Sequence, residues 1–392
     1  MQTSSLFSEL LPTPASIASI IAEIGPTLGR KPTPAPEPAP ASKLKSKPPE
    51  STTEEAITSN SLPPRRTNPW QRQGTTLLDE ATTDPDIAIG KAGLDWDAHR
   101  VDIRSADTLD PIPDFKAIRR SDTGAILGVV GKNFEPYQNR QMFNVIKELS
   151  RVGREGMMPL TIETAGSFQG GRVTWVLAHL PDLGIRIGDD HARVYLLLST
   201  GHVGNRGFLL GPTTIRPICG NTLQLAETRM RDQRKRPGLA GGFTIKHLPG
   251  MHLAADEARD AFAATIRSHA ATKAAWEFLA SKPLTTALKD AFLGRLFGRP
   301  GTDEADRAQA LRRAREARID AIIASPTSQV HGTKDSGLSL LHSVVEYIDH
   351  DRTTRSSNPG ESAESRHVSA TYGSGSEMKS RAFDAILELT GA

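Results

Sequence analysis

The sequence of 392 residues contains one cysteine, Cys219, so an internal disulfide and a zinc site built from cysteines are both excluded. No run of about 18 apolar residues occurs, which argues against a spanning helix and a membrane partner. Residues 1–5 carry no basic side chain, and Glu9 precedes the apolar stretch 15–22. A secretory signal needs positive charge first, so we expect a cytoplasmic protein.

The net charge is small, and aromatic side chains are few. The formal charge is +3, and aromatic residues make up 5% of the chain, which is little for a base-stacking surface. Apolar residues reach 37%, below the usual ~45–50%. Because 13 of the 27 prolines lie in the first 70 residues, we predict a disordered Pro-, Ser- and Lys-rich leader over residues 1–74. A short helix at 15–24 is an alternative within it.

Residues 75–392 have the pattern of a single α+β domain, β-rich over 118–220 and mainly helical over 221–392. Strand-like runs are expected at 125–130, 160–164, 171–180, 192–200 and 213–219, with turns at 181–182 and 188–190. Helical spacing is found at 139–154, 223–236, 253–282, 303–325, 335–350 and 377–390, and a polar loop is expected at 351–376. We therefore predict a central antiparallel sheet flanked by C-terminal helices.

A glycine-rich segment, Gly201–Gly207, leaves a predicted strand and precedes Arg216. Its backbone N–H groups and Arg206 could hold a phosphate, although a hairpin connection explains the same glycines. Asn221 either contacts a ligand or caps the helix expected from 223. Residues 229–236 hold five basic residues and one acid, which suits either a polyphosphate or a solvated helix end.

We predict that nucleic acid or another anion contacts the following residues: His202, Gly204, Asn205, Arg206, Arg216, Asn221, Arg229, Arg231, Arg234, Lys235 and Arg236. Trp175, Phe134 and Phe208 are interpreted as core aromatics rather than stacking platforms. We predict no cofactor, catalytic residue or metal ligand.

An enzymatic alternative rests on acids and histidines that the sequence cannot bring together by itself. Glu163 and His202 have the chemistry of a base and an acid, and Asp189-Asp190-His191 has metal-binding groups at an expected hairpin tip. A second acidic cluster follows at Glu346–Asp351. The helix expected at 303–325 alternates acids and arginines, so it is an exposed helix or an oligomer contact.

Several segments, in order, resemble the phage/plasmid-like proteins of the domain of unknown function 932 family. They are Gly93–Ile103, Ile118–Ile146, Glu163–Pro181, Leu196–Ala226, 344–355 and 369–389. The resemblance runs from about Leu77 to Leu389 and implies carriage on mobile elements in a bacterial host cell, without an established activity. The family's usual His-Asp-Gly-Ser is here His202-Val203-Gly204-Asn205, so a role for that acid cannot be carried over.

Three hypotheses for function follow from the sequence. The favoured one is a non-enzymatic protein that binds DNA, single-stranded or duplex, and serves maintenance or recombination of a mobile element. The second is a metal-assisted enzyme acting on nucleotides or nucleic acid. The third is a homo-oligomeric interaction protein that modulates host defence.

Overall fold

The structure is a computed structural model. It describes residues 77–155, 160–204, 206–216, 221–223, 243–245, 269, 272–298, 306–353 and 362–391. The leader predicted over 1–74 lies outside the described residues, as do most of the helices predicted at 223–236 and 253–282. None of the described helices combines the length and apolarity needed to cross a membrane.

The centre of the molecule is an antiparallel seven-stranded sheet, sheet A, with strand order β1-β5-β6-β7-β8-β10 and β9 paired to β8. Its strands are β1 (Leu77–Thr82), β5 (Thr161–Phe168), β6 (Val173–Ile187), β7 (Asp190–Gly201), β8 (Phe208–Arg216), β9 (Asn221–Leu223) and β10 (Phe243–Ile245). The predicted α+β class and its central antiparallel sheet are confirmed.

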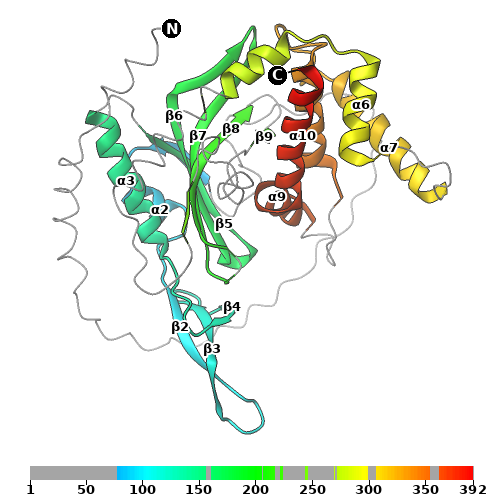
Figure 1. The fold of residues 1–392 in the computed structure, drawn as a ribbon. Coiled ribbons are helices and arrows are strands. Elements are labelled where there is room, and N and C mark those ends of the chain that lie inside the picture. Colours follow the sequence, from blue (N-terminus) through cyan, green and yellow to red (C-terminus); the bar gives the residue numbers. More distant parts are fainter. Residues whose placement is uncertain are drawn as a thin grey trace, which may run out of the picture.

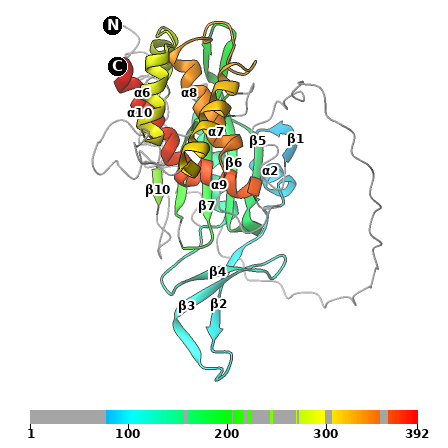
Figure 2. The same cartoon turned by 90° about the vertical axis from the view of Figure 1, so that its right-hand side faces the viewer.

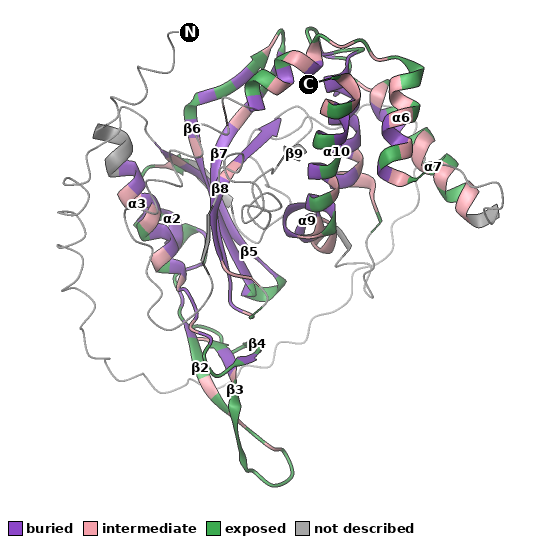
Figure 3. Cartoon of the chain, in the orientation of Figure 1, coloured by how far each residue is buried: buried purple, intermediate pink, exposed green. Residues whose placement is uncertain are grey.

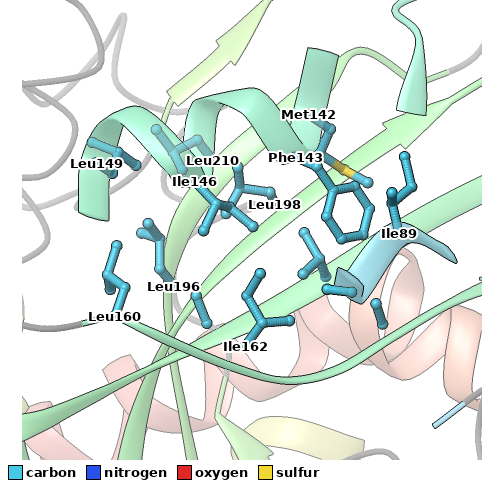
Figure 4. Close-up of a cluster of buried hydrophobic side chains, with 14 of the residues drawn as sticks. Ile89, Met142, Phe143, Ile146, Leu149, Leu160, Ile162, Leu196, Leu198 and Leu210 are labelled. Carbon is cyan, nitrogen blue, oxygen red and sulfur yellow. The ribbon is translucent and has the colours of Figure 1, made fainter. Parts of the chain in front are cut away.

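Helices α2 (Pro85–Lys91) and α3 (Asn139–Glu155) cover one face of sheet A (Figure 1). The predicted spacing on α3 is confirmed, because Met142, Phe143, Ile146 and Leu149 are all buried there. They pack on Ile89 and on leucines of β7 and β8 (Figure 4). This apolar layer fixes α3, and with it Asn139, against the sheet.

The C-terminal helices cover the opposite face, as predicted (Figures 1 and 2). They are α6 (Thr286–Phe297), α7 (Asp306–Ile323), α8 (Gly337–Glu346) with a π-helical turn at Tyr347–Asp351, α9 (Ser362–Tyr372) and α10 (Ser374–Thr390). Their core includes Ile185 and Ala192 from the sheet, and a second cluster joins Trp175 to Tyr372. The core assignments of Trp175, Phe134 and Phe208 are confirmed.

The β6–β7 hairpin tip is fixed by two glycines. Gly188 has φ +60°, and a Cβ added there would lie 2.4 Å from the His331 carbonyl oxygen. Gly332, with φ +93°, meets the Cα of Gly188 in the same way, and the Asp189 N–H donates to the His331 carbonyl (2.9 Å). The tip and the segment before α8 therefore touch through bare backbone, which places Asp190 beside the helical layer.

A second sheet, sheet B, was not predicted from the sequence, although the strand expected at 125–130 is confirmed as its third strand. It consists of β2 (Ala98–Arg104), β3 (Pro111–Arg120) and β4 (Ile126–Gly131), in that order, and both pairings are antiparallel. It projects from one end of sheet A as an arm (Figures 1 and 2). Much of the arm is exposed (Figure 3).

Three local predictions were wrong. The turn expected at Pro181-Asp182 lies inside β6, where a register shift between Leu180 and Ile185 accommodates a residue without an N–H donor. Asn221 caps no helix, because it pairs with Arg216 in β9. The loop expected at 351–376 contains α9, which buries Val368 and Tyr372 against the sheet.

Candidate nucleic-acid interface

Arg216 is buried in a two-point ion pair. Its Nε donates to Asp190 Oδ1 (3.0 Å) and its Nη2 donates to Asp190 Oδ2 (2.6 Å). The Arg216 and Asp190 side chains are 2% and 4% exposed. Nη2 also donates to the Thr327 carbonyl (3.1 Å). The charge predicted to meet an anion is therefore neutralised within the fold, where it ties the end of β8 to the hairpin tip and to the segment before α8.

The Asp190 carboxylate has further neighbours in the helical layer. The Thr333 hydroxyl donates to Asp190 Oδ2 (2.9 Å), and His342 Nδ1 lies 3.8 Å from the same oxygen. Burial, aided by the Arg216 charge, holds the pKa of His342 well below its ordinary value. In the predicted metal-binding group at 189–191, Asp190 is therefore engaged in the ion pair with Arg216. Asp189 is exposed on the surface, where it lies near His331.

His202 is fully buried and belongs to a different network. Its Nε2 lies 3.0 Å from Asn139 Oδ1, which also accepts a hydrogen bond from Thr174 Oγ1 (2.8 Å). Asn139 Nδ2 donates to the carbonyls of Leu94 (3.0 Å) and Trp96 (3.4 Å). This network joins the start of α3, sheet A and the segment that leads into sheet B.

We predict that Asn139→Ala lowers the free energy of unfolding by about 1–3 kcal/mol, because it leaves buried carbonyls and the Thr174 hydroxyl without their amide partner. Urea unfolding followed by circular dichroism measures the change. Asn144→Ala is the control, since Asn144 is exposed on the same helix. Equal stabilities for the two variants would contradict this role of Asn139.

The glycine-rich segment serves as the hairpin connection between β7 and β8, and its first residues pack under sheet B. A Cβ added to Gly128 of β4 would lie 2.6 Å from Val203 Cγ1, and one added to Gly204 would lie 3.7 Å from Val130 Cγ1. The Trp96 ring is 5.1 Å from that of His202 and stacks under the Arg120 guanidinium (4.3 Å). The segment therefore holds the base of the arm.

The remaining predicted anion contacts do not form one surface among the described residues. Arg206 is half-buried, lies over the Tyr372 ring (4.9 Å) and donates to the Tyr372 carbonyl (3.3 Å). For Asn221 the structure gives only the backbone, in β9. Asn205 and the basic cluster at 229–236 lie outside the described residues, so their predicted role stays a prediction.

Glu163 belongs to a polar cluster on neighbouring strands of sheet A. It pairs with Arg193, accepts from the Tyr195 hydroxyl (2.8 Å) and lies 3.3 Å from His179 Nδ1. Burial and the Arg193 charge lower the pKa of His179. The neighbouring Thr164 pairs with Leu177, whereas Gly201, just before His202, pairs with Val173, so Glu163 and His202 belong to separate networks.

The acidic cluster at Glu346–Asp351 is likewise divided among separate partners. Thr327 donates to Glu346 (2.9 Å), buried Lys379 donates to Asp349 (2.8 Å), and Arg318 pairs with Asp351 (3.1 Å). Across the described residues, no group of three or more His, Cys, Asp or Glu side chains has an arrangement that could hold a metal ion.

The strongest candidate for an exposed binding surface is one face of sheet B, which we name the open face. Two cross-strand rows and one aromatic residue make up this face: Val101–Ala117–Val129, His99–Arg119–Ile126, and Phe115. Phe115, Val129 and Ile126 are 49%, 57% and 53% exposed. Large apolar side chains at such exposure mark interaction surfaces when they adjoin one another.

The open face also carries charge of one sign. Of its seven side chains, Arg119 is cationic, His99 is an imidazole, and none is acidic. Within the part of the chain that the structure describes, Arg119 has no ion-pair partner. The face therefore combines an aromatic ring, aliphatic side chains and an available guanidinium, which is the composition of surfaces that hold single nucleic-acid strands.

The other face of sheet B is buried at its base and charge-balanced further out. Ile118, Leu127 and Val130 are buried with Trp96 and Phe134 at the base of the arm. Residues one position out of register with the open face form ion pairs: Lys116–Asp102, Lys132–Asp114 (2.8 Å) and Arg100–Glu135 (3.1 Å). The Lys132 hydrogen bond and charge hold the pKa of Asp114 below its ordinary value. The two faces thus differ in charge pairing as well as in exposure.

Sequence reasoning missed the open face, although a signal was present. Apolar and charged residues alternate over 100–104: Val101 is half-buried, whereas Arg100, Asp102 and Arg104 are exposed. Such period-two alternation predicts a strand. The exposed apolar residues of β3 and β4 gave no signal, because the sequence does not state which face remains uncovered.

Comparison with protein families matches residues 126–370 to the family described as Domain of unknown function (DUF932). No curated protein and no solved structure matches the chain. The matched region begins at β4 and ends within α9, so it covers the hairpin segment that anchors the arm, the Arg216–Asp190 pair, and the Asn139, Thr174 and His202 side chains.

Proposed function

The chain belongs to the DUF932 family, whose function is unknown, and we propose that it binds DNA through the open face of sheet B. The observation that carries this proposal is Arg119, which has no ion-pair partner among the described residues and lies beside exposed apolar side chains on a face without acids. A phosphate satisfies the guanidinium by charge-assisted hydrogen bonds, and the apolar surface accepts bases or sugars. Binding of this kind requires no catalytic group.

Position on the molecule supports the proposal as well. The arm projects from one end of sheet A, away from the C-terminal helices (Figures 1 and 2). The base of the arm is held by Arg120, which stacks on Trp96 and donates to the Gly170 carbonyl (3.0 Å). A face presented on a supported arm meets its ligand without a large ordering cost.

The proposal changes the residues that were expected to bind. Arg216 and His202 support the fold, and Arg119, Phe115 and His99 take their place as contacts. The basic cluster at 229–236 stays a predicted second contact. A role in the maintenance or recombination of a mobile element also stays a proposal, based on the resemblance of the sequence to phage/plasmid-like proteins.

Arg119→Ala should weaken binding of the full chain to a short fluorescein-labelled DNA and lower the slope of log K against log salt by about 0.7–0.9, the value for one lost phosphate contact. Fluorescence anisotropy over a range of salt concentrations measures both quantities. Arg313→Ala removes the same charge from an exposed position on α7 and serves as the control.

Two results would count against the proposal. One is the absence of binding by the intact protein at low salt. The other is an equal loss of affinity in the Arg119 and Arg313 variants, which would mean that net charge, rather than the open face, attracts the DNA.

A further inference from the structure

We propose that Phe115 stacks on one base of a single DNA strand, in the space above Gly131, and thereby selects single strands over duplexes. This inference rests on the proposed function and names its substrate. Phe115 lies on the central strand of sheet B, and its partner across the β3–β4 pair is Gly131. Its ring is half exposed.

Gly131 leaves room that any other residue would fill. A Cβ added at this position would have nothing within 4 Å, and its φ is not in the left-handed region. The glycine is therefore not required by the backbone or by packing. Its consequence is that Phe115 has no cross-strand side chain opposite it in the β3–β4 pair.

The neighbouring rows extend the site along one strand of DNA. Ala117, two residues further on β3, is buried between Val101 and Val129, and these two valines continue the apolar surface next to the ring. Arg119 follows two residues later, about 13 Å from Phe115 at the usual rise per residue. A base on Phe115 and a phosphate on Arg119 thus belong to one short stretch of a single extended strand.

Duplex DNA cannot use this ring in the same way. Its bases already stack on one another and present only their edges in the grooves, so Phe115 would have to unstack a base pair at a cost of a few kcal/mol. A single strand exposes base faces at no such cost, and stacking on an aromatic side chain tolerates any sequence. The geometry therefore favours a single strand of mixed sequence.

A second copy of the chain fits the open face less well. A standard protein interface uses ~20–30 residues on each side, whereas the open face has seven side chains. A symmetric pairing of two open faces would also bury both copies of Arg119 without an acid on either face to neutralise them. The face therefore complements an anion better than it complements itself.

The test measures binding of the full chain to a labelled oligothymidine and to a labelled duplex of equal length. Phe115→Ala, Phe115→Leu and Gly131→Val should each weaken single-strand binding by about 5- to 150-fold, the range for one stacked base, and leave duplex binding unchanged. Phe115→Leu keeps an apolar side chain but removes the ring. Gly131→Val leaves Phe115 unchanged and fills the space across the β3–β4 pair. Ile112→Ala is the control, because Ile112 is also exposed on β3 but is out of register with the residues of the open face.

Each outcome has a distinct meaning. If the intact protein binds neither DNA, the proposed function fails together with this inference. If it binds both forms equally, or if Phe115→Leu and Gly131→Val bind oligothymidine like the intact chain, only the stacking inference fails. If light scattering shows an oligomer that Phe115→Ala dissociates while DNA binding is unchanged, the open face is a self-association surface and the inference is overturned.

Discussion

Arg216→Met is expected to lower the free energy of unfolding by about 3–5 kcal/mol, the usual cost of leaving one charge of a buried ion pair alone. The variant would strand the Asp190 carboxylate, with the Thr333 hydroxyl and the His342 ring left beside it. It would also free the Thr327 carbonyl that Arg216 Nη2 satisfies. Urea unfolding monitored by circular dichroism measures the loss.

A double variant separates the lost charge pair from lost packing. Arg216→Met combined with Asp190→Leu removes both charges, and buried pairs replaced together by apolar residues are often neutral in stability. We therefore expect the double variant to recover most of the loss. Arg186→Met on β6 is the control, because Arg186 is exposed near the same hairpin tip. A loss below about 1 kcal/mol for Arg216→Met, or a double variant no better than the single one, would contradict a stabilising pair.

The same variant discriminates between the two assignments of Arg216. A residue that is 2% exposed and paired with Asp190 has no donor to offer a phosphate. Below its unfolding temperature, Arg216→Met should bind DNA with the affinity and salt dependence of the intact chain. A reduced salt slope would instead restore Arg216 as an anion contact.

Helices and strands were predictable from the sequence where the local apolar pattern agrees with burial in the fold. Met142 and Ile146 recur at helical spacing, and the runs that became β6 and β7 are continuously apolar because helices cover both faces. Segment α9 was missed because Val368 and Tyr372 are too few to give a helical period. They are buried because they contact sheet residues that are distant in the sequence, and no local pattern indicates this contact.

The site was less predictable, because its charges are decided by long-range partners. Arg216 and Asp190 are 26 residues apart, and only the β7–β8 pairing brings them together. The sequence therefore could not distinguish an arginine that meets solvent from one that meets a carboxylate. Arg119 illustrates the converse, since its exposure depends on which face of sheet B is left uncovered.

Acidification is expected to destabilise the fold through two buried histidines. Burial, the Lys379 charge and His350 lower the pKa of His367 to about 3, and burial with the Arg216 charge holds the pKa of His342 well below its ordinary value. Both rings are therefore neutral in the folded chain near neutral pH, whereas the unfolded chain takes up protons below about pH 6.5. Because the unfolded state then binds more protons, stability falls as the pH falls.

The expected slope is about 1.4 kcal/mol per pH unit for each histidine, beginning near pH 6.5 and continuing towards the folded pKa of His367. His367→Leu removes one of the two contributions. The loss of stability between neutral pH and about pH 4.5 should then be smaller than that of the intact chain by about 3 kcal/mol. Urea unfolding at the two pH values measures this difference.

The comparison must isolate His367 from the other groups that titrate in acid. The Asp349–Lys379 pair lies near it but is present in both proteins, so its contribution cancels in the difference. His331→Gln is the matched control, because its side chain is 77% exposed and should leave the pH dependence unchanged. If His367→Leu and the intact chain lose equal stability on acidification, the ring takes up its proton as readily in the fold as in the unfolded chain, and the packing of α9 on Phe168 must accommodate a charge.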